Sequence, residues 1–156
     1  METLTHLDPA TKDAVADLIH ANVNEAHALE EALRQSDSLG LGVHLRSLAR
    51  ERRALAHQLQ SLLGMSGEHQ PRTSSLRSEI ELLWKGFKNA ILGGDPERIV
   101  TQVIAGEDRL EHAYHEALRA APASPLNATL MDHVRRIRND KETLRVLMSS
   151  LQSPIA

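Results

Sequence analysis

The sequence contains no cysteine, which excludes disulfide bonds, thiolate metal sites and cysteine nucleophiles. It also has only one Trp, one Tyr and one Phe, and runs of the β-branched and aromatic residues that form strands are scarce. Leu and Ala supply most of the apolar residues, which make up 41% of the chain. Because Leu and Ala favour helices, this composition predicts an all-α protein.

Long hydrophobic runs and excess positive charge are missing as well. No uninterrupted apolar run approaches the length that spans a membrane, and the N-terminal stretch does not have the pattern of a secretory signal. The formal net charge is −3, so no global basic field attracts nucleic acid or an anionic membrane. Two arginine clusters, at 50–53 and 135–138, have no aromatic residues among them, which makes nucleic-acid binding a poor interpretation. We therefore expect a cytoplasmic protein without nucleic-acid or membrane partners.

Apolar residues recur at three- and four-residue steps through most of the chain, a spacing that is typical of amphipathic helices. At 156 residues the chain is expected to form one domain, 1–156, with a core of its own. The periodicity and the Pro and Gly positions predict four long helices, at about 9–35, 39–63, 96–120 and 126–151. Gly40 and Gly42 weaken the first turn of the second helix, so a start nearer Val43 is the alternative to Leu39.

A shorter helical segment is expected at about 74–93, between the second and third long helices, and residues 152–156 are expected to form a frayed tail. A segment of this size spans roughly 25 Å, close to what is needed to carry the chain back along a bundle. That connection is the ferritin-like one, and we prefer it to a fifth helix packed across one end. Trp84 and Phe87 on this segment either pack over the bundle or form an exposed patch for homodimerisation.

Glu107 projects from the centre of the apolar stripe of the third long helix. The stripe is formed by Ile99, Val103, Leu110 and Tyr114. Because burying a lone charge is prohibitive, a carboxylate at this position must bind a metal, pair with a cation or carry a proton.

Charged residues near the midpoints of all four helices are expected to meet Glu107. Three further carboxylates lie at corresponding positions, on Glu25, Glu51 and Asp140. Two cations, Arg52 and Lys141, also fall on inner faces. The preferred interpretation is a charge-paired layer in which Glu25 and Glu107 are satisfied by Arg52, Lys141 and Asn22, an arrangement that can fix helix register.

The alternative interpretation is a metal site in which Glu25, Glu51, Glu107 and Asp140 bind iron or manganese. Ferritin-like di-metal sites take a Glu-x-x-His pair from each of two helices, and no such pair occurs in this sequence. His44 and His133 each precede a candidate ligand by seven residues, two helical turns, which is too far to share one ion. We expect partly buried, hydrogen-bonded histidines there, no resident cofactor and no catalytic residue.

Several short motifs resemble a ferritin-like family of uncharacterised bacterial four-helix-bundle proteins. The resemblance is closest from residue 51 onward and looser in the first helix. The motifs that carry it are Gly64, Ser75-Leu76, Trp84-Lys85-Gly86-Phe87-Lys88-Asn89-Ala90, Leu92-Gly93-Gly94-Asp95, Gly106-Glu107-Asp108 and Tyr114-His115-Glu116-Ala117-Leu118, with Glu25 and Glu30-Glu31-Ala32 in the first helix.

The resemblance implies a ferritin-like four-helix bundle whose function is not settled. The sequence departs from the family pattern where metal ligands would lie, with Gln58 in place of an acid and Asn139 in place of a His. We therefore expect a non-catalytic structural or partner-binding bundle, with a homo-oligomer or a protein partner. The alternative function is a metal-binding oxidoreductase or metal store.

Overall fold

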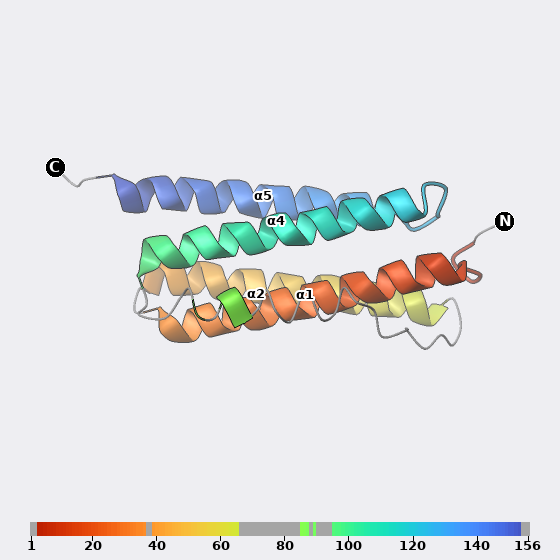
Figure 1. The fold of residues 1–156 in the computed structure, drawn as a ribbon, viewed down its shortest axis with the longest axis horizontal. Helices are drawn as coiled ribbons and strands as arrows, with labels where there is room; N and C mark the ends of the chain where they lie inside the picture. The colour runs from red at the N-terminus through yellow and green to blue at the C-terminus, as the bar shows by residue number, and fades with distance from the viewer. Residues whose placement is uncertain (1–2, 37–38, 66–84, 88, 90–94, 154–156) are drawn as a thin grey trace.

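Four long helices lie side by side in the protein (Figure 1). The computed structural model describes residues 3–36, 39–65, 85–87, 89 and 95–153. The helices are α1 (Pro9–Gln35), α2 (Leu39–Met65), α4 (Pro96–Ala120) and α5 (Asn127–Gln152). Residues 85–87 and 89 are also helical. The described residues as a whole contain no β-strand. The prediction of an all-α protein is confirmed for the described residues.

The helix starts follow from local sequence at two of the four N-termini, those of α1 and α4. Proline occupies the first helical position of α1 and of α4, where its missing N–H would have no partner anyway. Asp95 caps α4 by accepting a hydrogen bond from the backbone N–H of Glu97, at 3.2 Å. The α5 helix begins at Asn127, one residue later than predicted.

The α2 helix extends further at both ends than its glycines suggested. It begins at Leu39, as the predicted range 39–63 has it and not at the alternative start near Val43, and it continues through Gly64 to Met65. A glycine inside a helix costs only about 1 kcal/mol, and packing along α1 outweighs that cost. Gly42 contributes to this packing, because a Cβ built on it would lie 3.3 Å from Leu33 Cδ1 of α1.

The directions of the helices require a long connection between α2 and α4. The α1 and α2 helices are antiparallel, as are α4 and α5, whereas α2 and α4 begin at the same end of the molecule (Figure 1). The end of α2 and the beginning of α4 therefore lie at opposite ends of the molecule (Figure 1). Most of the predicted segment 74–93 lies outside the described residues, and so does Trp84. Phe87 is described and is buried.

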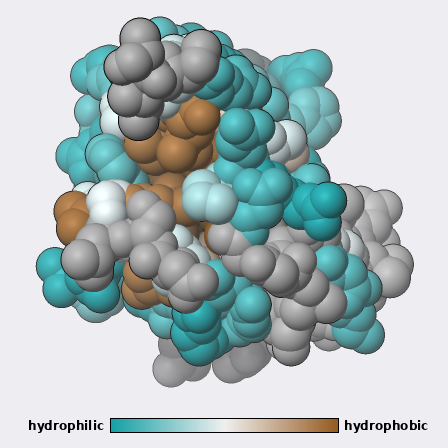
Figure 2. All heavy atoms as spheres, turned by 90° about the vertical axis from the view of Figure 1, so that its left-hand side faces the viewer, coloured by the Kyte–Doolittle hydropathy of each residue, from teal (hydrophilic) through white to brown (hydrophobic). Residues whose placement is uncertain are grey.

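The core consists of two apolar clusters with a polar layer between them. One cluster packs around Leu18, Leu55, Tyr114 and Val134, and the other around Leu29, Leu45, Val103 and Leu144. Figure 2 shows apolar side chains in the middle of the end near the second cluster, surrounded by hydrophilic ones. Ile99, Val103, Leu110 and Tyr114, the predicted apolar stripe of α4, are all buried, so this helix presents its apolar stripe to the core as the periodicity predicts.

Polar residues from all four helices occupy the level between the two clusters. The buried ones are Asn22, Glu25, Arg52, Glu107 and Lys141. The candidate site therefore lies between the two apolar clusters, with one cluster on each side.

Candidate functional site

Arg52 of α2 and Glu107 of α4 form an ion pair at the centre of the polar layer, and both side chains are fully buried. Arg52 Nε donates to Oε1 and Oε2 of Glu107 at 3.1 and 3.2 Å, and Nη2 donates to Oε1 at 2.7 Å. Burial raises the pKa of Glu107, and the guanidinium opposes this rise. The predicted buried ion pair at Glu107 is confirmed, with Arg52 as the partner.

Two further carboxylates surround the same guanidinium. Nη2 of Arg52 donates to Oδ2 of Asp140 on α5 at 2.6 Å, and Nη1 lies 3.7 Å from Oε1 of Glu51. Burial and a hydrogen bond with Asp140 raise the pKa of Glu51 to about 7. Three of the four predicted carboxylates therefore meet at Arg52, which contributes the positive charge that makes their close approach favourable.

The fourth carboxylate, on Glu25 of α1, packs directly against the backbone of α4. Its atoms Oε2 and Oε1 would lie 2.7 and 2.9 Å from a Cβ built on Gly106. Burial raises the pKa of Glu25 to about 8, the charge of Glu107 adds to the rise, and the charges of Arg52 and Arg109 oppose it. The prediction that Arg52, Lys141 or Asn22 satisfies Glu25 is not met by any hydrogen bond among the described residues.

Lys141 pairs with acids other than those predicted. Its Nζ lies 2.7 Å from Oδ1 of Asp108 and 2.8 Å from Oε1 of Glu111, both on α4. Burial disfavours the charge of Lys141, but these hydrogen bonds outweigh it and raise the pKa. Desolvation acts against the charge of Glu111 too, yet its hydrogen bonds to Lys141, His115 and Arg138 lower its pKa to about 2.

A second buried network, next to the charged layer, links α1, α2, α4 and α5. Nδ2 of Asn22 donates to the Tyr114 hydroxyl at 2.9 Å, and this hydroxyl lies 2.7 Å from Nδ1 of His133. Nε2 of His133 lies 2.9 Å from Oε1 of Gln58. Because the hydroxyl already accepts from Asn22, it donates to Nδ1, which leaves the His133 proton on Nε2 facing Gln58.

This network carries a neutral histidine. Burial lowers the pKa of His133 to about 4, and the charge of Arg136 contributes to the decrease. The expectation of a hydrogen-bonded His133 is confirmed. Asn22, which was expected to satisfy Glu25 and Glu107, instead donates to Tyr114. One feature of the sequence could have indicated this network, because the hydroxyl of a buried tyrosine, here Tyr114, needs a hydrogen-bond partner.

The other described histidines lie outside the two apolar clusters. His44 is half-buried and His57 is exposed. The side chain of His112 is exposed and lies 3.5 Å from Glu116, and His115 pairs with Glu111 at 3.1 Å. None of these four described histidines forms a hydrogen bond with Arg52 or Glu107.

The arrangement of the predicted metal ligands does not fit a metal ion. Glu51, Glu107 and Asp140 face the guanidinium of Arg52, and Glu25 lies against Gly106. Within the described part of the chain, no group of three or more His, Asp or Glu side chains is placed to hold an ion. The iron or manganese site stays a prediction for experiment.

The fold and the site together define an all-α protein with a buried arginine–carboxylate layer. The chain belongs to the family described as Domain of unknown function (DUF2383), which matches residues 10–120. No curated protein and no solved structure matches the chain. None of the helices in the described ranges is long and apolar enough to cross a membrane.

Proposed function

We propose that the protein is a ferritin-like four-helix bundle with a non-catalytic, structural or partner-binding role. The observation that carries the proposal is the Arg52 guanidinium, which lies at the centre of the carboxylate layer where a ferritin-like protein would hold its metal. A long connection after the second helix is the ferritin-like one, and the parallel directions of α2 and α4 require such a connection. We also propose, from the sequence alone, that the protein is related to a bacterial ferritin-like family and is located in the cytoplasm.

The layer supports a structural role through specificity of packing. An ion pair with this degree of burial contributes little net stability compared with apolar residues. It does require α2, α4 and α5 to align at one level, because Arg52 must reach both Glu107 and Asp140. The pair therefore fixes the register of three helices, which keeps the outer surface for a partner in one arrangement.

Metal analysis tests the proposal directly. The protein would be expressed with added iron and, separately, with added manganese, and its metal content measured after purification. We expect far less than one equivalent of metal, and the same low content in Glu107→Gln. A stoichiometric metal content that is lost in Glu107→Gln would contradict the proposal and favour the alternative metal-binding function at Glu25, Glu51, Glu107 and Asp140.

Homodimer formation is the simplest partner interaction. Light scattering over a range of concentrations tests it: the mass should rise with concentration and should fall in Trp84→Ala, a position suggested by the sequence alone. One monomeric mass at every concentration would exclude a homodimer and leave a different protein as the partner.

A further inference from the structure

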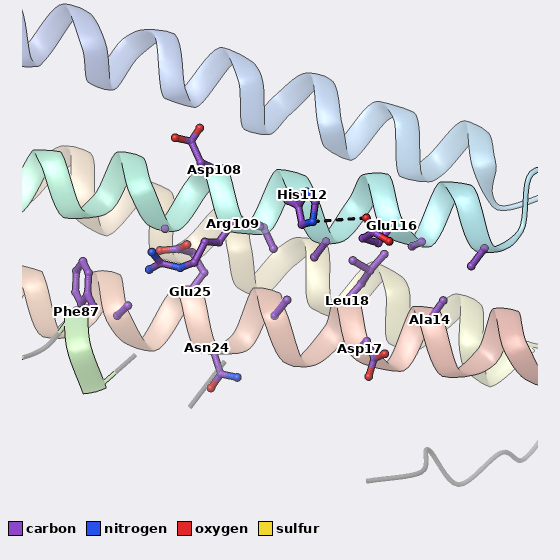
Figure 3. Close-up of a pocket in the computed structure, with 17 residues that line it drawn as sticks. Ala14, Asp17, Leu18, Asn24, Glu25, Phe87, Asp108, Arg109, His112 and Glu116 are labelled. Atoms are coloured by element: carbon purple, nitrogen blue, oxygen red, sulfur yellow. Dashed lines mark ion pairs between the residues drawn. The ribbon is translucent and has the colours of Figure 1, made fainter. Parts of the chain in front are cut away.

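A pocket of about 760 Å³ lies between α1 and α4 (Figure 3). Its walls consist mainly of small apolar side chains, among them Ala14, Ala21 and Ala28 of α1 and Leu110, Ala113 and Ala117 of α4. Along α1 these residues extend over about 21 Å at 1.5 Å per residue. The volume and the apolar walls are those of a small-molecule site, which typically adds a few well-placed polar groups.

Glu25 provides one such polar group, because its buried carboxyl group lines the pocket (Figure 3). The side chain is only 8% exposed. Among the described residues no hydrogen bond or ion pair reaches its carboxyl oxygens. A carboxyl group that is buried in this way avoids the desolvation of a charge by keeping its proton. Its O–H is then a donor that needs an acceptor.

Arg109 of α4 provides a second donor at the same place. It also lines the pocket, and its side chain lies beside that of Glu25 (Figure 3). No ion pair joins it to another residue of the described part of the chain. When Glu25 is protonated, the end of the pocket at Glu25 and Arg109 carries the positive charge of the guanidinium. It also has two kinds of hydrogen-bond donor, the N–H groups of Arg109 and the O–H of Glu25. This combination favours an anion that can accept from both.

We propose that this pocket binds a free long-chain carboxylate, with its head group between Arg109 and Glu25 and its acyl chain along the alanine-lined walls toward Ala14. Asp17, Asp108 and Glu116 also line the pocket, but Asp108 pairs with Lys141 and Glu116 pairs with Arg119. The positive charge of Arg109 beside Glu25 therefore favours a carboxylate over an amine at this end of the pocket. The elongated apolar walls select a straight chain over a compact ligand. The inference goes beyond the proposed function and rests on it in one respect, because Glu25 must be free of metal.

The protonation of Glu25 makes binding depend on pH. Glu107, Arg52 and Arg109 are the charged groups that act on it, and burial is the largest influence, which raises its pKa to about 8. Below this pH the carboxyl group donates to the ligand, and above it a carboxylate repels the ligand. Affinity should therefore fall as pH rises through 8, by up to about tenfold per pH unit.

Calorimetric titration with hexadecanoate, kept below its micelle concentration at pH 6.5, tests the proposal. We expect saturable binding of one equivalent, and weaker binding of shorter carboxylates, by up to about fourfold for each CH₂ removed. Ala113→Leu fills the pocket and should weaken binding at least tenfold. Ala54→Leu makes the same change on the exposed face of α2 and should leave binding unchanged, with circular dichroism confirming that both variants are folded.

Head-group variants separate the carboxylate from other ligands. Arg109→Gln should weaken binding at least tenfold, whereas Glu25→Gln keeps a neutral donor and should bind at pH 6.5 without the decrease above pH 8. Equal or tighter binding of hexadecylamine would overturn the proposal. So would the absence of saturable binding, binding only to phosphatidylcholine vesicles, or an unchanged affinity in Ala113→Leu. A metal-free protein without saturable binding would overturn this proposal and leave the proposed function standing, whereas a stoichiometric metal held by Glu25 would contradict both.

Discussion

The carboxylate of Glu25 on α1 occupies the space that a side chain at position 106 of α4 would take. A Cβ built on Gly106 would lie 2.7 Å from Oε2 and 3.2 Å from Cδ of Glu25. Glycine at the middle of a helix costs about 1 kcal/mol relative to alanine. The close approach of Glu25 explains why that cost is tolerated here.

Gly106→Ala should therefore destabilise the protein, although alanine favours the helix. The added methyl group displaces the carboxyl group of Glu25 within a packed layer, and overpacking of this kind typically costs about 1–3 kcal/mol. Urea unfolding measures the change. Gly40→Ala is the matched control, because nothing lies within 4 Å of a Cβ there, and it should be neutral or stabilising by up to about 1 kcal/mol. Equal stability of the two variants would contradict the close contact.

Arg52→Met should be among the most destabilising single substitutions in the chain. It leaves the carboxylate of Glu107 buried without its partner, which typically costs about 3–5 kcal/mol. Arg53→Met is the control on the neighbouring residue, since Arg53 pairs with Glu30 at the surface and such pairs contribute only about 0–1 kcal/mol. The double variant Arg52→Met, Glu107→Met should recover much of the loss. A small effect of Arg52→Met in urea unfolding would show that the pair is not formed.

The free energy of unfolding should fall as pH rises from about 4.5 to about 8 through the contribution of Glu25. Burial raises its pKa from 4.5 to about 8, so in this range the folded state keeps a proton that the unfolded state has lost. The slope is at most about 1.4 kcal/mol per pH unit. Glu51, with a pKa raised to about 7, acts in the same direction.

Glu25→Gln isolates this contribution, because it stays neutral at every pH. Relative to the natural chain, the variant should gain stability between pH 5 and pH 8.5, as measured by urea unfolding at both values. Glu142→Gln, at an exposed position, is the control. If the Glu25→Gln difference were constant with pH, the carboxyl group would not be buried in its neutral form.

Tyr114→Phe tests the second network. The change removes the hydroxyl that joins Asn22 to His133 and leaves two buried polar groups without their partner, at a typical cost of about 1–3 kcal/mol. It should also alter the His133 ring, which can be followed by NMR through its Nε2 proton facing Gln58. A variant with unchanged stability and an unchanged His133 signal would show that the hydroxyl makes neither bond.

Much of the fold could be predicted from the sequence, because the helix starts carry local signals. Asp8-Pro9 and Asp95-Pro96 mark the first residues of α1 and α4, and both helices have the predicted bounds. The α2 helix begins at the predicted Leu39 and not at the alternative start near Val43, because tertiary packing against α1 overrides the low helix propensity of Gly40 and Gly42.

The partners within the layer could not be predicted to the same degree. Arg52 and Lys141 both fall on inner faces, and both were expected near Glu107. Which acid each one reaches depends on the rotation and level of neighbouring helices, and one helical turn along α4 separates Glu107 from Glu111. Lys141 pairs with Glu111 and Asp108. This pairing is evident only from the three-dimensional arrangement of the helices.

The layer also has a consequence for how the chain folds. The helical hairpins α1–α2 and α4–α5 each have a short connection, whereas the contact between Arg52 and Glu107 joins one hairpin to the other across 55 residues of sequence. Each hairpin can form early with these two charges still hydrated. The charges lose water only when the hairpins dock, so we expect docking to be the slow step and the layer to be the last part of the core to become protected from hydrogen exchange.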